Sequence, residues 1–218
     1  MLRGKKYLNK QKGAVKTPVS LSEGIKSVKL NSYSSFDGTV ELKMALNSAN
    51  AVRFSVTYPN SFSKEQRILV FTDDSKKDIA VKAGAMYVGL EEYINKIKDG
   101  WFEFDIVIAT PSVMAKIAIL GKYLGTRGLM PNPKAGTITD DVETAIKTYK
   151  AGKTDFKTDK SGVLHVKVGK ISMKDEELLS NIEAAMKEFE KSTGKNIRSM
   201  LKSSYLVPTM GQSVKVVL

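Results

Sequence analysis

The sequence contains no cysteine, and this absence excludes disulfide bonds, thiolate metal sites and cysteine nucleophiles. It contains one histidine, His165, so no second imidazole is available to complete a metal site or a catalytic pair. We therefore predict no enzymatic activity, no metal and no cofactor. For His165 itself a solvent-facing strand position is the favoured interpretation, and a contact with RNA is the alternative.

Long hydrophobic runs are also missing. No segment approaches the roughly 18 apolar residues of a membrane span. The basic N-terminus is not followed by the apolar segment of a secretory signal. Hydrophobic residues make up 42% and charged residues 27% of the chain, which is ordinary usage for a folded globular protein. We expect a soluble protein with no membrane partner.

Positive charge is in excess, with 35 Lys and Arg against 23 Asp and Glu and a formal net charge of +12. Such an excess favours a polyanionic partner, nucleic acid first and an anionic membrane second. The first 16 residues carry Arg3, Lys5 and four further lysines without an acid, which is typical of a nucleic-acid-binding arm. A solvated tail or an organelle-targeting segment would have the same composition.

The two ends of the chain have the alternating pattern of half-buried strands. Apolar and polar residues alternate over residues 40–46, 52–58 and 164–168, and two more strands are expected over 200–206 and 213–218. Ser20 and Glu23 have capping-box spacing, which predicts a helix over residues 20–30. A second amphipathic helix covers residues 178–189, and Gly194 is its expected end.

The middle of the chain has a different pattern of apolar residues. Residues 68–71 and 104–109 are continuous apolar runs, which indicate parallel strands covered on both faces. A short strand near residues 86–88 and helices over 75–83, 91–98, 111–124 and 140–151 complete a βαβαβα alternation. We therefore expect an α/β protein of two domains. Residues 1–66 and 157–218 form a discontinuous α+β domain, and residues 67–156 form an inserted Rossmann-like domain with three layers.

The charge is divided unequally between these predicted domains. The outer segments carry 22 bases and 11 acids, whereas residues 67–156 carry 13 bases and 12 acids. Almost all of the excess positive charge therefore belongs to the outer segments. A polyanion is expected to bind there first.

A segment rich in glycine and proline, GTRGLMPNPKAG, occupies residues 125–136. Its glycines and bases are compatible with a phosphate-binding loop, and thus with a nucleotide-dependent enzyme. However, such a loop follows a strand and opens a helix, whereas these glycines close a predicted helix. A rigid loop stiffened by Pro131 and Pro133 is the favoured interpretation.

Phe36 stands at the expected start of a strand, between Ser35 and Asp37-Gly38. An aromatic side chain in this position either seals the edge of the core or stacks on an exposed base. Its hydrophobicity favours the core interpretation.

Several motifs together resemble the bacterial L1 family of large-subunit ribosomal proteins. They are GTRGLMPNPKAGT at residues 125–137, DKSGVLH at 159–165, VGK at 168–170, SSY at 203–205 and TMG at 209–211. GKKY at residues 4–7 and FDGTVE at 36–41 extend the resemblance over nearly the whole chain, in the order of the family.

The resemblance implies a ferredoxin-like RNA-binding domain with the Rossmann-like domain inserted into it. It implies a structural, non-enzymatic component of the large subunit that binds the ribosomal RNA of the L1 stalk near the tRNA exit site. Exit-site tRNA, whose release the protein would assist, and the leader of its own messenger RNA, whose translation it would repress, are further implied partners. The protein would be a monomer within the ribosome, in the cytoplasm or alternatively in an organelle.

The resemblance also implies the residues that contact RNA. The main set is Phe36, Thr39, Glu41, Asp159, Lys160, Ser203, Thr209, Met210 and Gly211. A secondary set is Arg3, Lys5, Arg53 and His165. An interdomain loop is expected to comprise Arg127, Gly128, Met130, Pro131, Asn132, Pro133 and Lys134.

Overall fold

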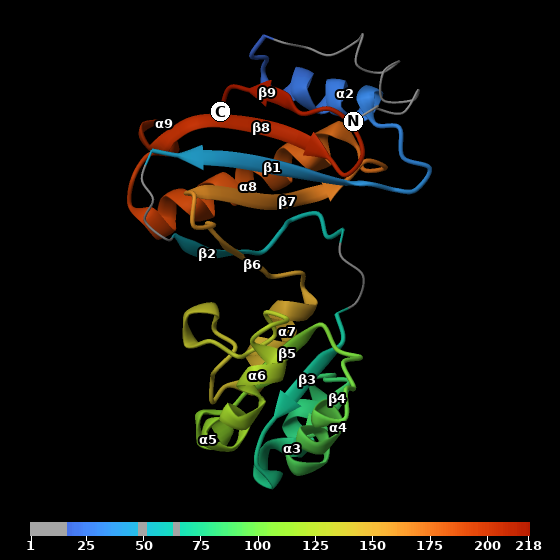
Figure 1. The fold of residues 1–218 in the computed structure, drawn as a ribbon, viewed down its shortest axis with the longest axis vertical. Coiled ribbons are helices and arrows are strands. Elements are labelled where there is room, and N and C mark those ends of the chain that lie inside the picture. The colour runs from blue at the N-terminus through green and yellow to red at the C-terminus, as the bar shows by residue number, and fades with distance from the viewer. Residues whose placement is uncertain (1–16, 48–51, 63–65) are drawn as a thin grey trace. The chain divides into compact units, whose positions relative to one another are not determined.

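The computed structural model describes residues 17–47, 52–62 and 66–218. Its contacts divide the chain into two compact units (Figure 1). The first consists of the described residues of Met1–Phe62 and Thr154–Leu218, and the second of those of Ser63–Lys153. The chain thus has a mixed α/β fold, with all of the long antiparallel strands in the first unit.

The first unit contains a four-stranded antiparallel sheet. Its strands are β1 (Thr39–Leu46), β7 (Val163–Lys170), β8 (Leu201–Pro208) and β9 (Val214–Val216), in the order β7-β1-β8-β9. Residues of β1 are alternately buried and half-buried, which confirms the strand predicted from the alternation of apolar and polar residues. One face of this sheet therefore belongs to the core.

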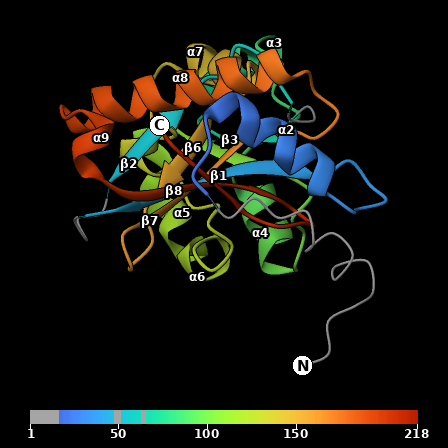
Figure 2. The same cartoon turned by 90° about the horizontal axis from the view of Figure 1, so that it is seen from above.

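Helices α2 (Leu21–Asn31) and α8 (Asp175–Thr193) cover the core face, as seen from above in Figure 2. The predicted capping box of Ser20 and Glu23 opens α2, and Gly194 ends α8 in the left-handed conformation, with φ of 64°. Ile182 and Phe189 of α8 are fully buried in one cluster with Leu42 of β1. The opposite side of the sheet, here called the open face, presents half-buried and exposed side chains.

A separate two-stranded sheet pairs β2 (Arg53–Val56) with β6 (Thr154–Lys157). Strand β6 was not predicted, because its polar residues hide the single buried Phe156. Its pairing places residues 154–156 in the first unit, whereas we had expected them in the inserted segment. The short helix α9 (Ile197–Met200) before β8 was also not predicted.

The second unit contains the parallel sheet expected from the continuous apolar runs. Strands β3 (Ile68–Phe71), β4 (Tyr87–Gly89) and β5 (Ile106–Ala109) lie in the order β4-β3-β5. Every residue of β3 is buried, as the run predicts. The helices α3 (Asp74–Lys82), α4 (Glu91–Lys98) and α7 (Val142–Lys150) lie close to their predicted positions.

The single helix expected over residues 111–124 is wrong in detail. The segment alternates between 3₁₀ turns, η1 (Pro111–Val113) and η2 (Ala118–Leu120), and short α-helices, α5 (Met114–Ile117) and α6 (Gly121–Leu124). The tighter turns contain hydrogen bonds between residues three apart. Ile117, Leu120 and Leu124 are nevertheless completely buried, so core packing is kept despite the change in helix type.

Among the described residues, no helix has both the length and the apolar character needed to cross a bilayer.

A buried asparagine joins three segments of the first unit. The Asn181 side chain accepts a hydrogen bond from the backbone N–H of Asn60 at 3.1 Å. It donates to the carbonyls of Asn60 and Val168, both at 2.9 Å. The contacts fix the segment after β2 against α8 and β7.

We expect the Asn181→Ala substitution to lower the free energy of unfolding by about 2 to 4 kcal/mol, because it leaves buried backbone groups without partners. Urea unfolding followed by circular dichroism measures the loss. The matched control is Glu183→Ala, two residues further along α8 at an exposed position, with an expected change within about 0.5 kcal/mol. Equal effects of the two substitutions would contradict the structural role of Asn181.

Candidate nucleic-acid interface

One end of the open face is formed where the start of β1 meets the end of β8. The backbone N–H of Thr39 donates to the hydroxyl of Thr209 at 2.8 Å, and that hydroxyl donates to the Thr39 carbonyl at 3.1 Å. The N–H of Thr209 also donates to this carbonyl, at 2.9 Å. Two residues 170 positions apart are thereby locked together at one corner of the sheet.

The segment after β8 continues this corner toward the end of α2. The carbonyl of Met210 accepts hydrogen bonds from the N–H of Tyr33 and from the hydroxyl of Ser32, both at 3.3 Å. A Cβ at Gly211 would lie 2.6 Å from Cγ of Pro208. The close approach requires glycine, because a larger residue would push the segment away from α2.

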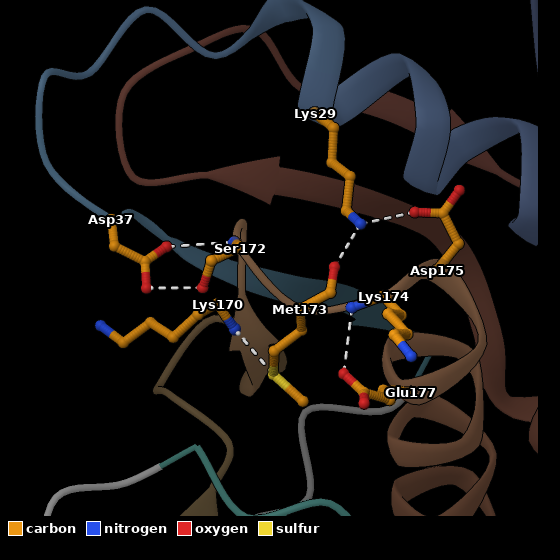
Figure 3. A network of polar contacts seen from close by, with 8 residues as sticks. All are labelled: Lys29, Asp37, Lys170, Ser172, Met173, Lys174, Asp175 and Glu177. Carbon is orange, nitrogen blue, oxygen red and sulfur yellow. Dashed lines mark hydrogen bonds and ion pairs between the residues drawn. The ribbon is translucent and has the colours of Figure 1, made fainter.

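Asp37 anchors the loop between α2 and β1, as Figure 3 shows. Its carboxylate accepts from the N–H of Ser172 at 3.1 Å and from the Ser172 hydroxyl at 2.8 Å. In the same network Lys29 pairs with Asp175 at 2.5 Å and donates to the carbonyl of Met173. The turn between β7 and α8 thus holds the loop that carries Phe36.

Two large apolar side chains are exposed at this corner. Phe36 has 57% and Met210 has 42% of its surface exposed. The core interpretation of Phe36 is therefore wrong: anchoring through Asp37 keeps the loop outside the sheet edge, where the ring faces solvent. Exposed apolar side chains beside polar groups are typical of a binding surface.

The remaining residues of the predicted contact set lie toward the other end of β1. Ser203 of β8 lies opposite Ala45, six residues along β1 from Thr39. At the usual rise per residue, Ser203 is therefore about 20 Å from the corner at Thr39. Lys160 is exposed in the turn that precedes β7. Asp159 accepts from the N–H groups of Ser161 and Val163 at 2.9 and 2.7 Å, so its carboxylate also shapes this turn. The predicted set thus forms two clusters on one unit.

Cross-strand neighbours that the sequence did not reveal lie between these clusters. The strand register aligns Lys43 with His165 on one side and with Tyr205 on the other, and Tyr205 with Lys215 of β9. This row, His165-Lys43-Tyr205-Lys215, crosses all four strands on the open face and is here called the central row. The alternation of apolar and polar residues in β1 predicts that Lys43 lies on the polar face of the strand. The residues that lie opposite Lys43 could not be predicted, because strand register depends on pairing between distant segments.

The charge of the open face is predominantly positive. Lys43, Lys167 and Lys215 point to it, and Glu41 lies opposite Lys167 in the register of β1 and β7. Lys170 donates to the hydroxyl of Thr39 at 3.1 Å, which brings a further ammonium group to the corner. A surface of this kind attracts phosphates while Glu41 can accept hydrogen bonds from ribose hydroxyls.

The secondary set is dispersed. His165 belongs to the central row and is exposed. Arg53 lies on β2, opposite Lys157 in the two-stranded sheet, and thus outside the four-stranded sheet. Arg3 and Lys5 lie outside the described residues.

The expected interdomain loop lies in the second unit. Gly128 has a φ of 71° after the end of α6, and Gly136, with φ of 75°, follows the 3₁₀ turn η3 (Pro133–Ala135) that contains Lys134. Arg127 is exposed and its guanidinium lies 3.8 Å from the centre of the Phe102 ring. The N–H of Asn132 donates to the Thr137 hydroxyl at 2.7 Å, while Pro131 is buried and Met130 packs against the core. The glycines of this loop do not lead into the N-terminus of an α-helix, where backbone N–H groups could bind a phosphate. The interpretation of the loop as a nucleotide-binding site therefore gains no support.

Within the described part of the chain, no three His, Asp or Glu side chains gather closely enough to hold a metal ion.

We expect the Gly211→Ala substitution to lower the free energy of unfolding by about 1 to 3 kcal/mol, because the added methyl group has no space beside Pro208 and the Asn31 carbonyl. Urea titration measures the change. The control is Gly121→Ala, where no atom lies within 4 Å of the added Cβ and φ is −52°. It should leave stability unchanged or raise it by up to about 1 kcal/mol. A Gly211→Ala protein as stable as the control would argue against close packing at the corner.

A model of the ribosomal protein L1p/L10e family matches residues 21–212, which include the corner, the central row apart from Lys215, and the glycine-rich loop. The match covers most of the chain and both compact units. The chain belongs to the ribosomal protein L1p/L10e family, and it is a ribosomal RNA-binding protein of the mixed α/β class.

Proposed function

We propose that the open face of the first unit binds the ribosomal RNA of the stalk near the tRNA exit site of the large subunit. The proposal rests on the exposure of Phe36 and Met210 at a corner built from three distant segments of the chain. Folding has placed these apolar groups in solvent and fixed the backbone around them. A partner with flat apolar surfaces and many hydroxyl groups, such as folded RNA, matches this arrangement.

The two ends of the open face have complementary roles in this proposal. At the corner, Phe36 and Met210 stack on bases, while Thr209 and the backbone near Gly211 approach ribose and phosphate. At the other end, Ser203 and Lys160 contact the RNA backbone. The separation of about 20 Å suits a folded RNA element that is held at two places, with the lysines of the central row between them.

We further propose that the first unit is the ferredoxin-like RNA-binding domain and the second the Rossmann-like insert. Their division at residues 62/63 and 153/154 lies three or four residues from the sequence-based boundaries of 66/67 and 156/157. In this proposal the protein acts as a monomer in the cytoplasmic ribosome, without catalysis, and assists the release of deacylated tRNA from the exit site.

The same face would accept a similar RNA element in the protein's own messenger RNA and would thereby repress translation. Competition between a stalk RNA fragment and the leader of that messenger RNA tests this role. Displacement of one RNA by the other supports a shared face, and simultaneous binding of both contradicts it.

We expect Phe36→Ala and Met210→Ala each to weaken binding of a stalk RNA fragment by about 1 to 3 kcal/mol, because each loses a stacking or apolar contact with a base. Filter binding at constant salt measures the affinity. The control is Leu30→Ala, which removes an apolar side chain with 73% exposure on helix α2 and should leave affinity unchanged. Unaltered affinity for both variants would refute the contact face.

We also expect Lys215→Gln to reduce the slope of log affinity against log salt by about 1, because one phosphate contact and its released counterion are lost. Lys195→Gln is the matched control, since Lys195 is exposed beyond the end of α8 and lies outside the open face. The two slopes are obtained from titrations at several salt concentrations. Identical slopes for the two variants would exclude the central row from the RNA interface.

A further inference from the structure

The second unit has a hollow of about 360 Å³ beside the end of α4. It lies between the start of β4 and the segment that follows α4. Its lining consists of three aromatic residues, two acids and one lysine: Tyr87, Tyr93, Trp101, Asp99, Glu103 and Lys96. This composition differs from that of the open face of the first unit, where lysines predominate.

The aromatic rings of the hollow form a compact group. The centre of the Trp101 ring is 4.8 Å from that of Tyr87 and 5.5 Å from that of Tyr93. Tyr87 meets Trp101 edge-on at 86°, and all three residues are only half-buried. Packing fixes the rings against one another while part of their surface stays accessible, so a ligand could stack on the exposed part of Trp101 or Tyr87.

The lining of the hollow contains two acids and one base, in a chain whose net charge is +12. Residues 91–105 contain five acids and two bases. Glu92 pairs with Lys96 at 2.5 Å, and Asp105 pairs with Arg67 at 3.0 Å. Asp99 and Glu103 are exposed, and neither forms a salt bridge with another described residue. Two carboxylates thus stand beside the aromatic surface.

Aromatic rings of this region already bind cations of the same chain. The guanidinium of Arg127 lies 3.8 Å from the centre of the Phe102 ring, and Nζ of Lys96 lies 5.0 Å from that of Tyr93. Both distances are within the range of cation–π attraction. Phe102 is joined to the hollow through Phe104, whose ring centre is 6.2 Å from that of Phe102 and 5.4 Å from that of Trp101.

We propose that this hollow binds an arginine side chain from a basic segment of a partner protein. A planar guanidinium stacks on an aromatic face and forms hydrogen bonds with a carboxylate in the same plane, which a lysine ammonium cannot do. RNA is a poorer match, because Asp99 and Glu103 repel the phosphates that would accompany a stacked base. The hollow belongs to the second unit, whereas the proposed RNA-binding face belongs to the first, so the two proposals rest on different residues.

Trp101 is the single tryptophan of the chain, so tryptophan fluorescence reports on the surroundings of this one side chain in the hollow. The full-length protein is titrated with a peptide of alternating glycine and arginine, and in parallel with the same peptide containing neutral citrulline. We expect saturable quenching by the arginine peptide and at least fivefold weaker binding of the citrulline peptide, a difference of about 1 kcal/mol.

The double substitution Asp99→Asn/Glu103→Gln should weaken binding of the arginine peptide by about fivefold. The control is Asp78→Asn/Glu183→Gln, which removes two exposed charges elsewhere and should bind like the unsubstituted protein. Absence of saturable quenching, equal binding of the citrulline peptide, or equal losses in the two double variants would overturn the proposal. Tighter binding of oligouridine than of the arginine peptide would also overturn it, because the hollow would then be an RNA site.

Discussion

The pairing of β1 with both β7 and β8 is the constraint on which the candidate interface depends. Strand β1 begins at Thr39, yet its two hydrogen-bonded neighbours begin at Val163 and Leu201. The approach of the Phe36 loop to the turn after β7 and to the segment after β8 follows from these two ladders. The reciprocal hydrogen bonds between Thr39 and Thr209 close the arrangement at its end.

The antiparallel sheet can serve two purposes because its side chains alternate between two faces. Leu42 and Met44 enter the core beneath α2 and α8, whereas Glu41 and Lys43 remain on the open face. In the proposed function, stability and RNA binding therefore use different residues of the same strand. We expect substitutions on the open face to change RNA affinity with little loss of folding free energy.

Local patterns in the sequence predicted most elements of the fold. The capping box at Ser20 gave the start of α2, Gly194 gave the end of α8, and the continuous run in β3 gave a parallel strand. Strand β6 was missed because four mostly polar residues have no clear period, and it forms only because β2 is its partner. The helix expected over residues 111–124 is interrupted because some of its backbone hydrogen bonds join residues three apart instead of four. The spacing of apolar residues does not reveal this change.

The candidate site was harder to predict than the fold. The resemblance to a family gave the corner residues, whereas hydrophobicity alone placed Phe36 in the core, where the structure shows it exposed. Apart from His165, the central row was missed because it arises from the register of four strands, three of which lie more than 100 residues from β1. The sequence around Lys43 or Tyr205 gives no sign of an interface. The two residues become neighbours only through the pairing of their strands.

Photo-crosslinking of a stalk RNA fragment that carries 4-thiouridine, followed by mass spectrometry of the crosslinked peptides, tests RNA binding at the open face. We expect crosslinks at Phe36, Tyr205 and Met210, all on or beside the open face of the first unit. Crosslinks confined to the exposed sides of α2 and α8, or to the second unit, would contradict it.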